Sequence, residues 1–446
     1  MDILLIAAYH PQTKLSRYGG WIPTSRIIHH SFINHQLKLA RSPMSTNQPH
    51  KEAVANFEIA IKADKEMVKL FDKIFKQAAP ENKIKSFDQL LYALDPIIDA
   101  PPAFHITTDD EGNPIGEPIG VPIYLLFDLL SNTGAAHQLF QMNAFNSTLK
   151  DLLDNWGGYL KTTDSTKTLT NTEEGWFGKV GLESLEDKGR GIFNDTYFCP
   201  NPTAVNRGYG SWDEFFTRKF NEDVRPIIRP DPDPQRIIYS ACESTPYRIA
   251  YKVKDHDRFW LKEQEYSIYD MLGGDSEAAG KFAGGTVYQA FLSPQDYHRW
   301  HAPIDGTIVR AETLPGTYYA VLPDKGAEIG DPDLKPGEPY GALIRSQAWI
   351  TQASARAIIY IQAENEDLGL VAFIGVGMAE VSTCEITVQK GQAVKVGDEL
   401  GMFHFGGSSH TLIFGPQVDV TFAREVVIDK HVKVNSVLAQ VSKPFF

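Results

Sequence analysis

Three groups of residues in the second half of the chain have the types and spacing that could do chemistry. Two glycines and two serines stand together at Gly406-Gly407-Ser408-Ser409. A glycine carbonyl is unhindered, so the Ser408 hydroxyl could attack it and move the acyl group from nitrogen to oxygen. β-Elimination of that ester leaves dehydroalanine, and hydrolysis then gives a pyruvoyl group. The alternatives are a plain β-turn, which composition alone favours, and a hydrolase elbow, which fails because His410 replaces the final glycine.

The second group is a histidine pair, His298 and His301, in the segment SPQDYHRWHAP at residues 293–303. Two histidines at this spacing could ligate a metal, but no glutamate lies between them and no third ligand is evident, so we predict no metal site. A structural role, with the rings bonded to backbone carbonyls, is the more common one for such a pair. The third group is a lone carboxylate, Glu243, which follows the strand-like residues 237–239 and would ordinarily be a solvated surface residue.

Short runs of β-branched and aromatic residues, separated by glycines, surround these groups and predict strands. The runs are residues 306–314, 317–322, 357–362, 371–376, 384–388 and 418–422. Residues 390–401, KGQAVKVGDELG, are typical of the tight turns in a lipoyl-like barrel sandwich. The second half of the chain therefore predicts a strand-rich domain.

The first half of the chain has helical rather than strand patterns. Apolar residues recur at three-to-four spacing in residues 51–79, 86–95, 123–131 and 137–160. Pro80 and Pro96 are expected to end the first two helices, and the proline-rich residues 101–122 to form a connection. We therefore predict an α+β protein with a helical N-terminal module at residues 1–204 and a strand-rich domain at residues 205–446.

Composition excludes several classes of protein. The 446 residues carry 56 acidic and 43 basic side chains, a net charge of −13 that repels nucleic acid and anionic lipid. The three cysteines are scattered, which argues against a disulfide framework or a zinc knuckle. The opening residues are not typical of a signal peptide, and the longest apolar run is too short to span a bilayer. The sequence thus predicts a soluble cytoplasmic protein that binds neither nucleic acid nor membrane.

Several motifs occur together in an order that carries a resemblance. They are FFTRKF at 215–220 followed by RPI at 225–227, YHRWH at 297–301 followed by APIDG, LPG at 314–316, and GMFHFGGSS at 401–409. With these motifs, residues 211–446 resemble the pyruvoyl-dependent phosphatidylserine decarboxylase family. The resemblance implies that the chain cleaves itself between Gly407 and Ser408. Ser408 would then become the pyruvoyl group, and residues 408–446 would remain as a small subunit.

The resemblance also implies roles for the other candidate residues. In the family a histidine oriented by a carboxylate activates the serine, and the matching residues here are His301 and Glu243. Glu243 stands where the family has an aspartate, so its longer side chain must be set back to reach the imidazole of His301. His298 matches a histidine that lies near the pyruvoyl group and assists decarboxylation.

A closer resemblance is to the fungal branch that decarboxylates free aromatic amino acids, the tryptophan decarboxylases. The shared segments are ACES at 241–244, YHRWHAP at 297–303, PGTY at 315–318 and STCE at 382–385. This implies a carboxy-lyase that forms a Schiff base with a small amino-acid substrate, with the pyruvoyl group as electron sink instead of pyridoxal phosphate. Two alternatives stay open: a phosphatidylserine decarboxylase acting on membrane lipid, and a non-catalytic lipoyl-like barrel in which GGSS is only a turn.

Overall fold

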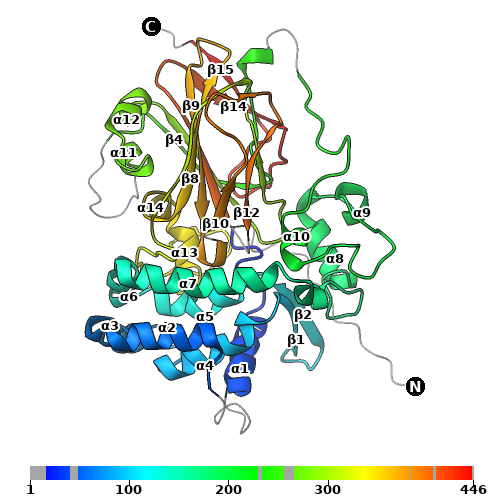
Figure 1. The fold of residues 1–446 in the computed structure, drawn as a ribbon, viewed down its shortest axis with the longest axis vertical. Helices are drawn as coiled ribbons and strands as arrows, with labels where there is room; N and C mark the ends of the chain where they lie inside the picture. The colour runs from blue at the N-terminus through cyan, green and yellow to red at the C-terminus, as the bar shows by residue number, and fades with distance from the viewer. Residues whose placement is uncertain are drawn as a thin grey trace. The chain divides into compact units, whose positions relative to one another are not determined.

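A computed structural model describes residues 17–40, 49–229, 234–255, 266–381, 383–404 and 408–443, and it confirms the α+β class (Figure 1). Contacts between Cα atoms divide the chain into two units. The first comprises Met1–Phe216 and Tyr318–Ser346, and the second comprises Thr217–Thr317 and Gln347–Phe446. This division differs from the expected boundary near residue 205, because residues 205–216 and a later segment join the first unit.

The first unit is built mainly from helices. They are α1 (Arg26–Ala40), α2 (Glu52–Ala63), α3 (Lys65–Gln77), α4 (Phe87–Ile98), α5 (Pro122–Ser131), α6 (Gly134–Phe140), α7 (Asn143–Leu160), α8 (Lys179–Glu186), α9 (Phe193–Thr196), α10 (Trp212–Phe216) and α13 (Ala342–Arg345), with the short 3-10 helices η1 (Thr163–Thr168) and η2 (Asp187–Gly189). The single helix expected at residues 51–79 is two helices. The Asp64 carboxylate caps α3 by accepting hydrogen bonds from the backbone N–H groups of Glu66 and Met67, at 2.8 and 3.2 Å.

Two predictions based on proline are wrong. The helix expected to stop before Pro96 continues to Ile98, since a proline in the last turn removes only one backbone hydrogen bond. The connection expected at residues 101–122 contains an antiparallel hairpin of β1 (Ala103–Thr108) and β2 (Pro114–Ile119). Each strand of this hairpin pairs on one side only, so prolines within β2 are tolerated.

The segment Tyr318–Ser346 joins the first unit through its aromatic residues. The ring of Tyr319 lies 5.2 Å from that of Phe140, and the hydroxyl of Tyr340 contacts His30 Nε2 at 2.8 Å. Because these side chains are buried among the helices, residues 318–322 do not form the expected strand, and Thr317 makes only an isolated bridge. The unit boundary therefore follows aromatic packing rather than sequence order.

The second unit contains the sheets. Its strands are β3 (Ile237–Tyr239), β4 (Thr245–Tyr251), β5 (Thr286–Leu292), β6 (Arg299–His301), β7 (Gly306–Leu314), β8 (Arg356–Ala363), β9 (Leu370–Gly377), β10 (Thr383–Ile386), β11 (Ala393–Val394), β12 (Glu399–His404), β13 (Ser408–Phe414), β14 (Asp419–Phe422) and β15 (Val437–Ser442). The helices of this unit are α11 (Ile268–Met271), α12 (Ser276–Phe282), α14 (Gln347–Ala353), η3 (Pro234–Arg236) and η4 (Ala379–Val381). The strands expected at residues 306–314, 357–362, 371–376, 384–388 and 418–422 are present within a few residues of these bounds.

Among the described residues, seven strands form one antiparallel sheet in the order β11-β7-β8-β9-β13-β5-β4. Two smaller sheets have the orders β10-β12-β6 and β14-β15-β3. One face of the large sheet shares an apolar core with the smaller sheets, and α14 contacts β9 and β13. In Figure 1, α11, α12 and α14 lie to one side of the long strands, and β12 and β14 to the other. The strand β13 is thus central and enclosed on both faces.

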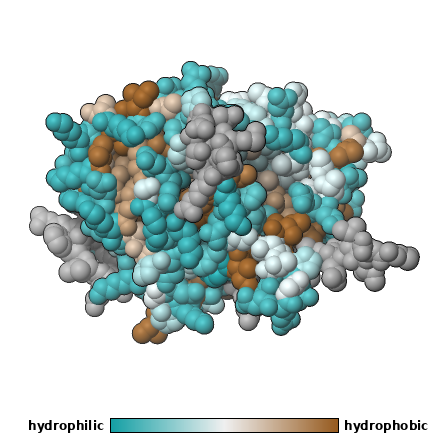
Figure 2. Space-filling model, turned by 90° about the horizontal axis from the view of Figure 1, so that it is seen from below, coloured by the Kyte–Doolittle hydropathy of each residue, from teal (hydrophilic) through white to brown (hydrophobic). Residues whose placement is uncertain are grey.

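The surface of the molecule is mostly hydrophilic, with separate hydrophobic areas, on the face drawn in Figure 2. The exposed apolar side chains of the described residues include Ile59 and Ile192, and single exposed apolar residues are ordinary in folded proteins. Across the described ranges, no helix is both long enough and apolar enough to cross a bilayer.

Candidate active site

Ser408 is the first residue of β13 and is fully buried. It pairs with Leu292 of β5 on one side and with Gly377 of β9 on the other. Its Oγ atom has no hydrogen-bond partner among the described residues, which is uncommon for a buried polar atom. Gly407, the other residue expected at a cleavage site, lies outside the described residues. The structure therefore holds an unpartnered hydroxyl at the start of a central strand.

His298 lies in the segment between β5 and β6 and is fully buried. Its backbone carbonyl accepts a hydrogen bond from the N–H of Phe403 in β12, at 2.9 Å. Because β12 ends at His404, this bond places the backbone of His298 beside the strand that precedes Ser408. The structure thus brings His298 and the end of β12 together.

His301 ends β6, and both of its ring nitrogens have partners. Nδ1 lies 2.6 Å from the carbonyl oxygen of Gly397, and Nε2 lies 2.8 Å from the hydroxyl of Tyr297. A carbonyl oxygen only accepts, so Nδ1 carries the proton and Nε2 accepts from the tyrosine. Burial lowers the pKa of His301, which keeps the ring neutral near pH 7. The ring therefore has the tautomer of a base at Nε2, but it is not hydrogen-bonded to Ser408.

Two aromatic rings form a stack with this histidine. The ring of Tyr297 is stacked on Phe220 with centroids 4.0 Å apart, and on His301 with centroids 5.6 Å apart. The guanidinium of Arg225 lies over the other end of the stack, 5.1 Å from the centroid of the Phe220 ring. The stack fixes the plane of the His301 imidazole.

Glu243 does not contact His301, contrary to the expected carboxylate–histidine pair. Its Oε1 accepts from Nε and Nη2 of Arg225 at 2.9 and 2.5 Å, and its Oε2 accepts from the backbone N–H of Val434 at 2.6 Å. A fully buried carboxylate needs a positive partner, and a neutral imidazole cannot supply one. The carboxylate therefore forms an ion pair with Arg225, and Glu243 is linked to His301 only through Arg225 and the aromatic stack.

Replacing Glu243 with glutamine should lower the free energy of unfolding by about 3 to 5 kcal/mol, because the buried guanidinium of Arg225 loses its counter-charge. Denaturant unfolding of the uncleaved chain measures this loss. The control is Glu364→Gln, which removes an exposed ion pair with Lys395 and should cost about 0 to 1 kcal/mol. Equal effects of the two substitutions would contradict the structural importance of the Glu243 pair.

Sequence reasoning did not single out a second buried carboxylate, Asp296. Its Oδ2 accepts from the backbone N–H of Ser293 at 2.7 Å, and its Oδ1 lies 3.3 Å from Nε2 of His431. Both side chains are buried. Asp296 directly precedes the YHRWH motif, so its position was a usable signal, whereas His431 lies in no motif. The pair joins the histidine segment to the chain that follows Ser408.

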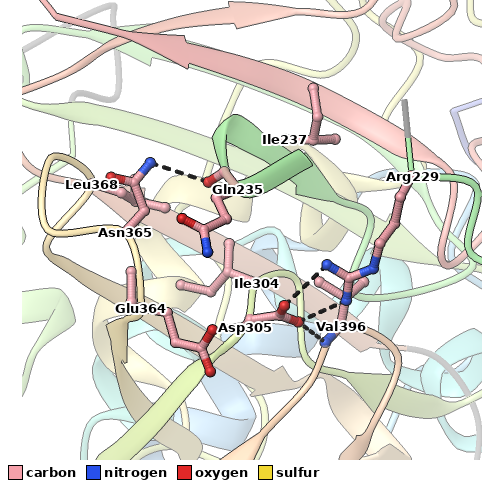
Figure 3. Close-up of a pocket in the computed structure, with 10 residues that line it drawn as sticks. Arg229, Gln235, Ile237, Ile304, Asp305, Glu364, Asn365, Leu368 and Val396 are labelled. Atoms are coloured by element: carbon pink, nitrogen blue, oxygen red, sulfur yellow. Dashed lines mark hydrogen bonds and ion pairs between the residues drawn. The ribbon is translucent and has the colours of Figure 1, made fainter. Parts of the chain in front are cut away.

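The turn that carries Gly397 is held by an ion pair shown in Figure 3. The guanidinium of Arg229 binds both oxygens of Asp305, at 3.0 and 2.9 Å, and Asp305 also accepts from the backbone N–H of Val396 at 2.8 Å. The adjoining cavity has a volume of about 10 Å³, which is room for a single water. This cluster therefore has a structural role. It positions the turn whose Gly397 carbonyl accepts from Nδ1 of His301, and so it supports the tautomer of His301.

Other reactive groups in the described part of the chain are few. No group of three or more His, Cys, Asp and Glu side chains there could hold a metal ion. Cys199, Cys242 and Cys384 are free thiols. Burial raises the pKa of Cys242 well above its usual value, so this cysteine is a poor nucleophile.

Comparison with known proteins assigns the family. Models that describe phosphatidylserine decarboxylases match residues 212–440 and 51–185. The chain is 54% identical to the decarboxylase iboD of Amanita muscaria over 78% of this chain and 99% of that protein. It is 33% identical to an L-tryptophan decarboxylase of Psilocybe cubensis, over 90% and 89% of the two chains. A phosphatidylserine decarboxylase proenzyme of Schizosaccharomyces pombe is 31% identical over 52% of this chain and 21% of its own length. The chain belongs to the phosphatidylserine decarboxylase family of carboxy-lyases.

Proposed function

We propose that this protein is a pyruvoyl-dependent decarboxylase of free aromatic L-amino acids, tryptophan foremost, and that it matures by cleavage between Gly407 and Ser408. The observation that carries the proposal is the Oγ of Ser408 at the start of β13, which is buried and has no hydrogen-bond partner among the described residues. A self-derived cofactor requires a nucleophile that is held in place and shielded from water. The pairing of β13 on both sides holds the backbone of Ser408, and burial shields its hydroxyl. A cytoplasmic location is part of the same proposal.

In this maturation the Ser408 oxygen attacks the preceding carbonyl carbon, and the acyl group moves from the Ser408 nitrogen to its oxygen. His301 accepts the hydroxyl proton at Nε2, for which the hydroxyl of Tyr297 must release that atom. A base then removes the Cα proton of Ser408, and elimination breaks the Cβ–Oγ bond and leaves the Gly407 carboxylate and a dehydroalanine. Water then replaces nitrogen, ammonia leaves, and the new end of the chain is a pyruvoyl group.

The pyruvoyl group supplies a sink for the electrons left when carbon dioxide departs. Ser408 is fully buried, which shields this position from bulk solvent apart from the one water that forms the pyruvoyl group. His298, whose backbone is bonded to β12, is the group proposed to move the proton to the substrate carbon. The acidic character of the chain supports a free amino acid over a lipid.

The extent of similarity also supports an amino-acid substrate. Tryptophan decarboxylases of Psilocybe cubensis and Psilocybe cyanescens match 90% and 97% of this chain. The phosphatidylserine decarboxylase of Schizosaccharomyces pombe matches only 52%. Phosphatidylserine remains the second candidate substrate, because the family models carry its name.

Replacing His298 with alanine should leave cleavage largely intact and abolish decarboxylation, because its proposed role belongs to the second reaction only. Intact mass reports the cleavage, and release of carbon dioxide reports the decarboxylation. If both reactions proceed normally in this variant, His298 is a structural residue.

The substrate is tested with fully cleaved wild-type protein in the absence of detergent. We expect carbon dioxide from tryptophan, and less from alanine or serine, because burying an aromatic ring contributes several times more binding free energy than burying a small side chain. Phosphatidylserine liposomes form the second arm. Activity on the liposomes with none on aromatic amino acids would replace the proposed substrate with the lipid.

A further inference from the structure

His410 lies two residues after Ser408 on the same face of β13. Ser408 pairs with Leu292 and Gly377, and His410 pairs with Ala290 and Gly375, the next positions on the same face of β5 and β9. Two residues of a strand span about 7 Å, so the imidazole of His410 lies within reach of a molecule held at Ser408. The proposed steps of maturation and decarboxylation do not use His410.

The surroundings of His410 are aromatic. Its ring is stacked against Phe373 with centroids 6.0 Å apart and meets Tyr288 edge-on at 5.8 Å. The Trp300 ring lies 5.2 Å from that of Phe373. A Cβ atom added at Gly375 would lie 3.0 Å from Trp300, so the glycine leaves room for the indole on this face. All of these rings are buried.

Neither ring nitrogen of His410 has a hydrogen-bond partner among the described residues, and Nε1 of Trp300 has none either. A buried polar group without a partner is costly, and an apolar residue of the same shape would remove that cost. Burial lowers the pKa of His410 to about 3, so its ring is neutral and offers one donor and one acceptor. A neutral ring supplies no positive charge, so it is less suited than a cation to a second carboxylate or a lipid phosphate.

We propose that His410 recognises the substrate, by accepting a hydrogen bond at its unprotonated imidazole nitrogen from a neutral polar group on the substrate's aromatic ring. The inference rests on the proposed function and deepens it. It makes this histidine the residue that distinguishes an indole, which carries a ring N–H, from a plain phenyl ring. The orphaned imidazole gains its partner when such a substrate is bound, and the surrounding rings pack against the substrate ring.

The test compares His410→Phe with the wild-type protein. Phenylalanine keeps a ring that packs on Phe373 but removes both nitrogens. We expect normal cleavage, an unchanged or higher melting temperature, and a Trp-to-Phe ratio of kcat/KM about tenfold lower than that of the wild-type protein. A merely structural histidine would not move this ratio.

The matched control is Thr411→Val. Thr411 is also buried on β13 with an unpartnered hydroxyl, but it lies on the opposite face of the strand. Its replacement should leave the Trp-to-Phe ratio unchanged. His410→Leu is the second apolar variant, and the same tenfold fall is expected from it.

Each other outcome has a defined meaning. An unchanged ratio in cleaved His410→Phe overturns the inference and leaves the proposed function standing. If His410→Phe and His410→Leu both fail to mature while Thr411→Val matures, the histidine serves maturation or folding, and the inference is again wrong. If fully cleaved wild-type protein releases no carbon dioxide from any free aromatic amino acid, the proposed substrate fails, and the inference fails with it.

Discussion

Replacing Ser408 with alanine is expected to leave one uncut chain of 446 residues with no decarboxylase activity. The wild-type protein, in contrast, should separate under denaturing conditions into residues 1–407 and 408–446. The reason is that Ser408, in the proposed maturation, supplies both the nucleophile for cleavage and the atoms of the pyruvoyl group. Intact mass measures the cleavage, and a carbonyl-reactive probe should label only the small fragment of the wild-type protein.

The neighbouring serine provides a matched control. The hydroxyl of Ser409 accepts from Nε2 of Gln289 at 3.0 Å and donates to the carbonyl of Ala290 at 3.2 Å, so it is already bonded on the other face of β13. Ser409→Ala should therefore still be cleaved. A single full-length mass from an active wild-type preparation, with no carbonyl-reactive fragment, would refute the pyruvoyl hypothesis.

Replacing His301 with alanine should slow cleavage by about 10² to 10⁴, the usual contribution of a general base. A serine hydroxyl is a weak nucleophile until a base removes its proton. The tautomer of His301 leaves Nε2 unprotonated, so it can take that proton once the Tyr297 hydroxyl has released it. Purified precursor, followed by mass over time, measures the rate. Glu243→Gln should slow cleavage less, because Glu243 acts only through Arg225 and the aromatic stack.

The pH dependence of cleavage follows from the same histidine. Burial lowers the pKa of His301 below its usual 6.5, and the base must be unprotonated. The rate should therefore stay level as pH falls through 6.5 and decline only at lower pH, where Nε2 takes up a proton. Tyr297→Phe is the control, because it removes the hydroxyl from Nε2 and keeps the stacked ring. Normal cleavage of His301→Ala would remove the proposed role of this residue.

The elements predicted best are those whose signal is local. The strands at residues 237–239 and 306–314 have the expected bounds, because a short apolar run between turn residues leaves little choice. The helix break at Asp64 is also local, but it depends on one capping side chain within an otherwise continuous apolar pattern. Proline in β2 was misleading because its meaning depends on whether the strand is paired on both sides.

The sequence motifs select Ser408, His298 and His301 as candidate site residues, and their roles stay predictions. The partner of Glu243, in contrast, could not be read from spacing. That carboxylate binds Arg225, 18 residues earlier, and the backbone of Val434, 191 residues later. Such a choice between partners is settled by burial and charge in the folded chain, which no local pattern records.

The position of β13 between β5 and β9 also affects how the molecule folds. Ser409 bonds to Ala290, 119 residues earlier in the chain, so this strand can be seated only after long loops have closed. If cleavage depends on the pairing of β13 with β5 and β9, chains that have not reached the native register remain uncut. After cleavage, unfolding releases two molecules instead of one, so the melting temperature of the mature protein should rise with protein concentration. That of the uncut Ser408→Ala chain should not. The proposed maturation would thereby change unfolding from a unimolecular to a bimolecular equilibrium.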